Sequence, residues 1–305
     1  MTHANERYLY LNGEYIPESR GLVHFRDRGF VYGDAVFDTA RTFGGTLYRL
    51  EAHLDRLFRS LKYLHIDPGL DKAELASISE EVLERNRHLL GPNEDYWVTQ
   101  RISRGANVYE GPTDAEPTVI VECNPIPFAK RAILYRDGVE VVIPSVRRTP
   151  PESLSPNAKM QNYLNLIVAG LESEGDGPRS WPILLDTRGF LTEGTGSNLF
   201  LVRDGKLLTP KAAYVLAGIT RSVVMELSQN LGIECEETDL ALYDAATADE
   251  AFISSTSLCI CPVATISGQA VGDTAVPGPV TKQLMDAFVE EVGFDYVAQY
   301  LSHLG

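Results

Sequence analysis

The sequence lacks the features that direct a chain into or across a membrane. Its N-terminus, MTHANERYLYLNGEY, has neither the basic region nor the apolar region of a signal peptide. No apolar run among the 305 residues reaches membrane-spanning length. From these absences we expect a cytoplasmic protein.

Cysteine and clustered positive charge are also scarce. The four cysteines form no C-x-x-C pair and no Cys/His cluster with zinc spacing, so no metal site is expected. The chain has 27 basic and 42 acidic residues, which gives a net charge of −15. Nucleic acid and anionic membranes need clustered Lys and Arg, so neither is an expected partner. Any anionic ligand must be held by a local site.

What remains is the composition of a globular protein of two domains. Hydrophobic residues make up 44% of the 305 residues, and this length exceeds that of a usual single domain. The composition changes at NPIPFAKRA, where Pro125 and Pro127 end a strand. We therefore predict a small N-terminal α/β domain over 1–122, a linker over 123–133 and a larger domain over 134–305.

Both predicted domains mix helices and strands, which indicates an α/β fold of the α+β type. In the first domain, turn signals and apolar periodicity predict hairpins around Asn12-Gly13 and Gly44-Gly45, helices over 51–66 and 71–89, and strands over 95–103 and 117–123. In the second, they predict a strand over 139–146, a helix over 160–174, hairpins over 181–210, a helix over 220–232, a strand over 251–266 and a C-terminal helix.

One lysine, Lys159, stands in SPNAKMQNYLNL, a stretch with no other charge. Such a lysine can extend its amine to the surface, or it can be a desolvated amine that forms a Schiff base. Pyridoxal phosphate is the commonest carbonyl partner of a Schiff-base lysine. This cofactor needs a carboxylate at its ring nitrogen, a phosphate site and a substrate-side anion site.

Three stretches can meet the need for a carboxylate or a phosphate site, and each also has a plainer interpretation. Glu193 lies between apolar strands beside small residues, where it is either a ring-nitrogen partner or a turn acid. Thr220 is predicted as the N-cap of a helix that follows Gly218, which suits either an anion site or ordinary capping. The hydroxyls of SSTS, 254–257, suit a phosphate or a turn. A phosphate site also needs a cation, but the periodicity of its helix predicts that the candidate, Arg56, faces solvent.

Together these stretches resemble the class IV aminotransferases, the pyridoxal-phosphate family of branched-chain and D-amino acid transaminases. The resemblance rests on DRGFVYGDAVFDTARTF, the H-x-x-RL of His53 to Leu57, AKMQNYLN, LTEGTGSNLF, AGITR and the STS of 255–257. These motifs occur in the family's order and span nearly the whole chain.

The resemblance implies fold type IV, with a small α/β lobe and a larger lobe built on a β-barrel that binds pyridoxal 5'-phosphate. It assigns Lys159 as the Schiff-base lysine and Glu193 as the partner of the pyridine nitrogen. The other cofactor-binding residues that it implies are Arg56, Tyr163, Leu216, Gly218, Ile219, Thr220, Ser255 and Thr256. It further implies ping-pong transfer between an amino acid and a 2-oxo acid, and a homodimer in which loop 104–112 completes the neighbour's pocket.

The residues that would choose the substrate are less regular. The candidates for substrate binding are Tyr32, Phe37, Thr39, Arg41, Thr99, Arg101, Arg104 and Ser257. An arginine at position 41 resembles the pattern of the branched-chain group of enzymes. However, Asp38-Thr39 stand where those enzymes usually have Glu-Gly. Thr99 stands where that group carries an arginine, and the loop sequence ANVYEG lacks the Arg and His of the D-amino acid enzymes. Arg41, Arg101 and Arg104 are therefore alternative carboxylate anchors.

An L-branched-chain or broad-range L-amino acid transaminase is the first expectation. A D-amino acid or (R)-amine transaminase follows, and an aminodeoxychorismate lyase with the same cofactor is a third hypothesis. A homologue without catalytic activity is a fourth, and the presence of both Lys159 and Glu193 argues against it.

Overall fold

The computed structural model describes residues 6–106, 116–273 and 275–304. Unit 1 runs to Ile126 and also contains Ala158–Asn162, and unit 2 contains Pro127–Asn157 and the chain from Tyr163 onward. The boundary after Ile126 falls within the predicted linker, 123–133. That stretch holds the end of one strand and the start of a helix. Ala158–Asn162, which we assigned to the second domain, is part of unit 1.

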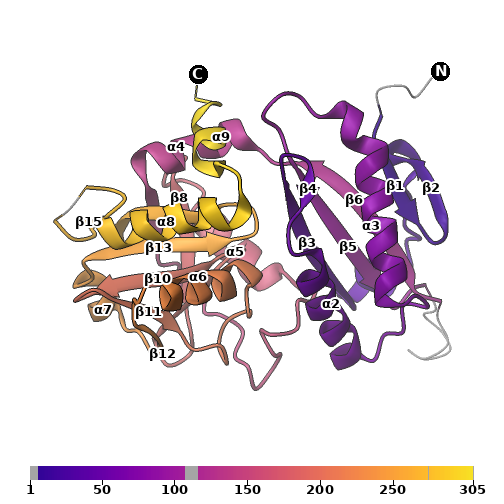
Figure 1. The fold of residues 1–305 in the computed structure, drawn as a ribbon. Coiled ribbons are helices and arrows are strands. Elements are labelled where there is room, and N and C mark those ends of the chain that lie inside the picture. The colour runs from indigo at the N-terminus through magenta and orange to yellow at the C-terminus, as the bar shows by residue number, and fades with distance from the viewer. Residues whose placement is uncertain (1–5, 107–115, 274, 305) are drawn as a thin grey trace. The chain divides into compact units, whose positions relative to one another are not determined.

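Unit 1 is built on a six-stranded sheet with the order β2-β1-β6-β5-β3-β4, in which neighbouring strands are antiparallel (Figure 1). The strands are β1 (Tyr8–Leu11), β2 (Glu14–Pro17), β3 (Ala35–Phe43), β4 (Thr46–Leu47), β5 (Tyr96–Ser103) and β6 (Thr118–Pro125). Both predicted hairpins are confirmed. The backbone has positive φ at Asn12 and Gly13, as a tight two-residue hairpin turn requires.

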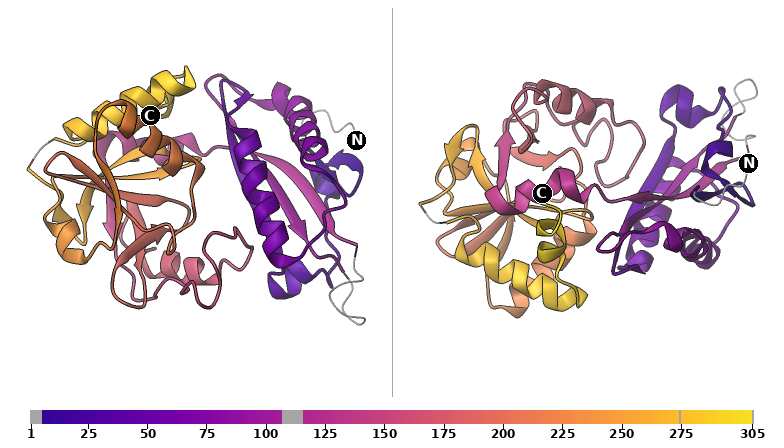
Figure 2. Two further views of the ribbon diagram at one scale, coloured as in Figure 1. Left: turned by 60° about the horizontal axis from the view of Figure 1, so that its bottom comes forward. Right: turned by 90° about the horizontal axis from the view of Figure 1, so that it is seen from above.

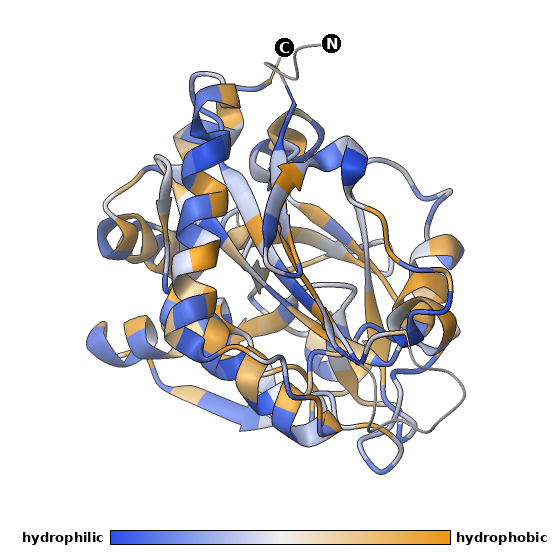
Figure 3. Ribbon diagram, turned by 90° about the vertical axis from the view of Figure 1, so that its right-hand side faces the viewer, coloured by the Kyte–Doolittle hydropathy of each residue, from blue (hydrophilic) through white to orange (hydrophobic). Residues whose placement is uncertain are grey.

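Helices cover one face of this sheet. The helical segments of unit 1 are η1 (Glu18–Arg20), α1 (Arg28–Tyr32), α2 (Leu50–Leu64), α3 (Lys72–Asn86) and η2 (Arg87–Leu89). α2 packs on β3 and α3 packs on β5 and β6, and both helices carry hydrophilic as well as hydrophobic residues (Figures 2 and 3). Alternate strand residues such as Val36, Val98 and Val121 are fully buried. Side chains of even number on β3 therefore point toward α2.

Unit 2 contains the β-barrel that the family resemblance implies. Its strands are β7 (Val139–Val142), β8 (Ser180–Leu185), β9 (Leu191–Gly194), β10 (Asn198–Arg203), β11 (Lys206–Pro210), β12 (Cys235–Thr238), β13 (Glu250–Ser255), β14 (Cys259–Ile266) and β15 (Gln269–Ala270). The order β10-β13-β14-β7-β8-β9 closes on itself because β9 also pairs with β10. The closing pair is Glu193 opposite Asn198, which fixes Glu193 where the barrel closes.

The helices of unit 2 are α4 (Phe128–Asp137), α5 (Leu164–Glu172), α6 (Ile219–Asn230), α7 (Leu242–Ala246), α8 (Pro279–Val292) and α9 (Tyr296–Leu301). α6 and α8 pack on the barrel strand β13 (Figure 1). Two predicted helix starts are wrong. α5 begins at Leu164, since Met160 instead pairs with Val36 at the edge of β3. α6 begins at Ile219 with Gly218, and not Thr220, at its N-cap.

Among the helices that the structure describes, none combines the length and the apolar character needed to cross a membrane.

Candidate active site

Lys159 is fixed in unit 1 by backbone hydrogen bonds on both sides. Its N–H donates to Ser60 Oγ (3.1 Å), and its carbonyl accepts from Phe37 N–H (3.0 Å). Two residues later, Gln161 N–H donates to the Ala35 carbonyl (2.8 Å). The amine of Lys159 lies 4.5 Å from the centre of the Phe37 ring. Lys159 therefore has a fixed main chain and an aromatic neighbour, and its side chain is partly buried.

Arg56 is buried, so our expectation from periodicity that it faces solvent is wrong. The buried face of α2 is wider than its leucine stripe and also includes His53 and Ser60. Asp38 of β3 pairs with Arg56 through two hydrogen bonds, Nε to Oδ2 and Nη2 to Oδ1, both of 2.8 Å. Polar residues can occupy this face because they bond to one another.

His53 completes the cluster around Asp38. Burial by itself raises the pKa of Asp38, but the charge of Arg56 and the hydrogen bonds from His53 and Arg56 hold this pKa well below its ordinary range. Burial lowers the pKa of His53, which outweighs the opposing effect of Asp38. The Nδ1–H of His53 donates to Asp38 Oδ1 over 2.7 Å, because an ionised carboxylate can only accept. The cluster consists of the Arg56–Asp38 ion pair and an imidazole that donates to the same carboxylate.

The opposite face of the unit 1 sheet carries several predicted substrate residues. Strand register places Phe37 opposite Arg101 and Thr39 opposite Thr99. The hydroxyls of Thr39 and Thr99 are 3.0 Å apart, and the Arg101 guanidinium lies 5.4 Å from the centre of the Phe37 ring. Arg101 Nε also donates to Glu122 Oε1 over 2.9 Å. The structure thus brings Phe37, Thr39, Thr99 and Arg101 together.

The three candidate carboxylate anchors differ in exposure. The side chain of Arg41 is 1% exposed, with its guanidinium 3.9 Å from Asp95 and over the Phe43 ring. That of Arg104 is 15% exposed, and that of Arg101 is 37% exposed. Exposure therefore favours Arg101 as the arginine that can meet a ligand.

Arg104 instead joins two parts of unit 1. Its Nε and Nη2 donate to Asp34 (2.8 and 3.0 Å), and it also donates to the carbonyls of Leu64 and His65 at the end of α2. Burial alone would raise the pKa of Asp34, but hydrogen bonds from Arg104 and Arg28 lower it. Among the other predicted residues, Tyr32 at the end of α1 is largely exposed.

In unit 2, both carboxylate oxygens of Glu193 are held. Oε1 accepts from Arg148 Nε and Oε2 accepts from Leu216 N–H, each over 2.9 Å. Asn198 Nδ2 donates to the Leu216 carbonyl over 3.0 Å. Glu193 is itself buried. The barrel therefore presents one carboxylate in a fixed orientation beside the backbone of Leu216.

The residues of the predicted anion site lie at the start of α6. Gly218 precedes the helix, and a Cβ at this position would come within 2.2 Å of Asn198 Oδ1. The first N–H groups of an α-helix have no acceptor within the helix, and its dipole favours an anion there. Ile219 and buried Thr220 form the first turn.

The remaining predicted residues of unit 2 lie in two places. Ser255 ends β13 and Ser257 lies in the turn that follows, where Ser255 Oγ accepts from Leu258 N–H (2.9 Å). The Ser257 hydroxyl accepts from Arg131, and Thr256 lies between the two serines, partly buried. Tyr163, at the N-cap of α5, packs on the buried cluster of Leu166, Ala169 and Leu184.

Sequence reasoning missed the residues that hold the predicted ones. Arg148, Asn198, His53 and Arg131 had no assigned role, and Asp38 was noted only as a departure from the branched-chain pattern. Arg148 lies 45 residues before Glu193, so no local spacing indicates their pairing. For Asp38, strand alternation was an available signal, since it points away from Phe37 and Thr39.

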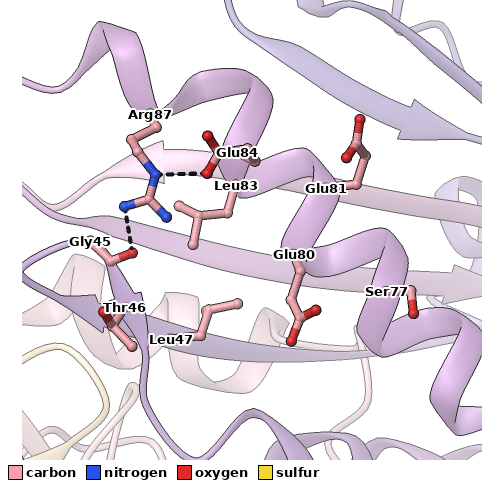
Figure 4. A pocket seen from close by; sticks show the side chains of 9 residues that line it. All are labelled: Gly45, Thr46, Leu47, Ser77, Glu80, Glu81, Leu83, Glu84 and Arg87. Carbon is pink, nitrogen blue, oxygen red and sulfur yellow. Dashed lines mark hydrogen bonds and ion pairs between the residues drawn. The ribbon is translucent and has the colours of Figure 1, made fainter.

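A surface cavity of about 450 Å³ lies elsewhere on unit 1 (Figure 4). Its lining residues are Gly45, Thr46, Leu47, Ser77, Glu80, Glu81, Leu83, Glu84 and Arg87. Arg87 is engaged there by Glu84 (2.8 Å) and by the Gly45 carbonyl (3.1 Å). The cavity contains none of the predicted site residues, and its three glutamates disfavour a phosphate.

Known proteins are similar in sequence to this chain over most of its length. Residues 35–266 match the family described as "Amino-transferase class IV". The chain is 37% identical over 283 residues to a "Putative branched-chain-amino-acid aminotransferase" of Methanocaldococcus jannaschii, with 92% of this chain and 94% of the relative covered. It is 29% identical over 285 residues to a "D-alanine aminotransferase" of Bacillus licheniformis, with 93% and 96% covered.

Solved structures agree in fold. The branched-chain amino acid aminotransferase of Escherichia coli matches with a TM-score of 0.85 and 30% identity over 93% of this chain and 94% of that one. The branched-chain enzyme of Thermobaculum terrenum, in its PLP form, matches with a TM-score of 0.81 and 28% identity over 99% of this chain and 98% of that one. The barrel of unit 2 and the helix-covered sheet of unit 1 thus have counterparts of known structure.

Proposed function

The chain belongs to the class IV aminotransferase family, and on this premise we propose that it moves an amino group between an L-amino acid and a 2-oxo acid with pyridoxal 5'-phosphate. Branched-chain amino acids are the proposed donors, as the names of the M. jannaschii and E. coli relatives suggest. The observation that carries the cofactor assignment is the buried carboxylate of Glu193, fixed by Arg148 and Leu216 N–H.

The residues present fit this cofactor. Lys159 supplies a primary amine, and Glu193 supplies a fixed carboxylate for the ring nitrogen. Arg56 and the start of α6 supply a cation and helix N–H groups for the phosphate. When bound, pyridoxal phosphate supplies a pyridine ring that draws electrons from the substrate Cα.

The chain's own groups then move one proton. Lys159 would hold the cofactor through its amine in the resting enzyme, and during the reaction the same amine would carry the proton from the substrate Cα to the adjoining cofactor carbon, first as base and then as acid. Glu193 would keep a proton on the ring nitrogen, because a carboxylate there favours the protonated ring. Arg148 and Leu216 N–H hold Glu193 in place during both half-reactions, which alternate in a ping-pong sequence.

Amino donors can be compared in single half-reactions. We expect L-leucine to remove the visible absorption band of the bound cofactor at least about 100-fold faster than D-alanine or (R)-1-phenylethylamine, since handedness decides which face of Cα meets the lysine. Stopped-flow absorbance measures each rate, and Lys159→Ala is the control that lacks the band.

The similarity to a D-alanine aminotransferase makes the D-amino acid enzyme the second candidate. A faster reaction with D-alanine would replace the first proposal with this one. If none of the three amines reacts but aminodeoxychorismate yields pyruvate, the protein is a lyase. Absence of cofactor from the wild type would remove all three functions.

We also propose a homodimer formed through unit 1. Large apolar side chains are exposed near α1, with Leu22 at 78%, Phe30 at 76% and Phe25 at 67% exposure. Contiguous exposed apolar surface commonly marks a protein interface. Of loop 104–112, which we expect to reach the neighbour's pocket, residues 107–112 lie outside the described ranges. The cytoplasmic location stays a prediction.

A charge within this apolar surface tests the dimer. We expect Phe30→Glu to weaken dimerisation by about 30-fold or more, because a carboxylate would replace a buried ring at the interface. Sedimentation velocity over a concentration series measures this change. Tyr243→Glu, at a residue 74% exposed in unit 2, is the matched control. Equal behaviour of the two variants would place the interface elsewhere.

A further inference from the structure

We propose that Asp38 is a positioning residue, which orients the guanidinium of Arg56 for the cofactor's phosphate group with His53 as its support. This inference rests on the proposed function, because it concerns how the phosphate of pyridoxal 5'-phosphate is held. It gives a role to two buried side chains, Asp38 and His53, that the mechanism above does not use.

The contacts of Asp38 leave the Arg56 guanidinium little rotational freedom. Two parallel hydrogen bonds of 2.8 Å join the Nε and Nη2 edge of Arg56 to the two carboxylate oxygens. Such a pair fixes the plane of the guanidinium as well as its position. His53 Nδ1 binds the same carboxylate over 2.7 Å, so the carboxylate itself is fixed. The orientation of Arg56 is thus set by unit 1 alone.

Burial makes Asp38 necessary for this arrangement. Arg56, Asp38 and His53 are all buried, and a buried guanidinium without a counter-charge is costly. His53 cannot provide that charge, because an imidazole is either neutral or positively charged. Asp38 therefore allows Arg56 to stay buried and oriented before any phosphate binds.

The direction of the side chain shows which face of the sheet is affected by the departure from the branched-chain pattern at this position. Phe37 and Thr39 point to the opposite face of the sheet, toward Arg101 and Thr99. Asp38 points toward α2. An aspartate where that pattern usually has glutamate thus changes the support of Arg56 and not the substrate-facing side of β3.

Asp38 has two opposing effects on phosphate binding. Its negative charge reduces the attraction of Arg56 for a phosphate, whereas its hydrogen bonds orient the donors of Arg56. We expect orientation to dominate, since an arginine binds phosphate well only when its planar N–H groups are aligned. An asparagine would also turn an amide NH₂ toward an N–H of Arg56 or His53, where no acceptor remains.

The experiment compares pyridoxal phosphate with pyridoxal, which lacks the phosphate. Full-length enzyme freed of cofactor is titrated with each aldehyde, and the visible band of the lysine adduct gives the two dissociation constants. We expect Asp38→Asn to weaken pyridoxal phosphate binding at least about tenfold and pyridoxal binding less than about threefold. Asp38→Glu should retain more of the preference for pyridoxal phosphate over pyridoxal than Asp38→Asn does, because it keeps the negative charge. Asp176→Asn, at an exposed site, changes neither constant.

The outcomes separate the possible explanations. If Asp38→Asn weakens the binding of both aldehydes by the same factor, the ratio of their dissociation constants is unchanged. Asp38 would then have a merely structural role, and the proposal would be overturned. Tighter phosphate binding would show that the charge effect dominates, and would overturn it too. In an Arg56→Ala background, Asp38→Asn should leave the ratio unchanged.

Circular dichroism tests whether the variants fold, and aldehyde binding by the wild type tests the proposed function. Should Asp38→Asn fail to fold, as judged by circular dichroism, Asp38→Glu and His53→Gln decide, and both must lower the ratio of the pyridoxal to the pyridoxal phosphate dissociation constant. A wild type that binds neither aldehyde would contradict the proposed function. A wild type that binds both, with no effect of these variants on the ratio, would contradict only the role of Asp38.

Discussion

Lys159→Ala is expected to lower turnover by about 10⁴-fold or more and to abolish the visible band of the bound cofactor. The variant removes the amine that we propose both holds the cofactor and moves the Cα proton. The segment around Lys159 is bound to β3 through its main chain, so the fold should survive the substitution. Turnover with L-leucine and the absorption spectrum measure the two effects.

Two further variants make this test specific. Lys130→Ala, at an exposed position of α4, should keep both band and activity. Lys159→Arg keeps the charge but cannot form the Schiff base, so it should behave like Lys159→Ala. A Lys159→Ala protein that retained the band would show that another lysine holds the cofactor.

Glu193→Gln is expected to lower turnover by about 10²- to 10³-fold, comparable to the loss of one electrostatic group in other enzymes. The amide cannot keep the ring nitrogen protonated, so the ring would draw fewer electrons from the substrate Cα. The visible band should remain but change its position, since Lys159 is intact. Stopped-flow half-reactions should show that proton removal from Cα has become slower.

The control for this variant is Glu174→Gln, an exposed glutamate after α5, which should leave both rate and spectrum unchanged. Glu193→Asp keeps the charge but shortens the side chain, so it cannot reach both Arg148 and Leu216 N–H as Glu193 does. We expect its rate to lie between those of Glu193→Gln and the wild type. Full activity in Glu193→Gln would exclude Glu193 as the ring-nitrogen partner.

The local elements of the fold could be predicted from the sequence because their signals are short. Asn12-Gly13 and Gly44-Gly45 mark turns by themselves, and the leucines of α2 recur at helical spacing. The barrel was different, because its closure depends on one pairing, Glu193 with Asn198, and on parallel pairs between distant strands. Only the family resemblance implied it.

The site residues also differed in whether their signal was local or depended on a partner distant in sequence. Lys159 and Glu193 stood out as charges in apolar surroundings, whereas Arg56 did not, because its partner lies 18 residues earlier on a strand. Periodicity treats every charge on a helix as solvated and cannot anticipate a carboxylate that meets it from the sheet. The same limit applies to Arg148, whose partner is also distant in sequence.

The chain passes from one unit to the other more than once, and this has a consequence for synthesis on the ribosome. Unit 1 needs Ala158–Asn162 to pair with the edge of β3, and these residues emerge only after Pro127–Asn157, the first part of unit 2. Unit 1 therefore cannot complete its fold while its main segment alone has been made. A gene fragment that stops at Ile126 would leave the β3 edge open and would omit Lys159.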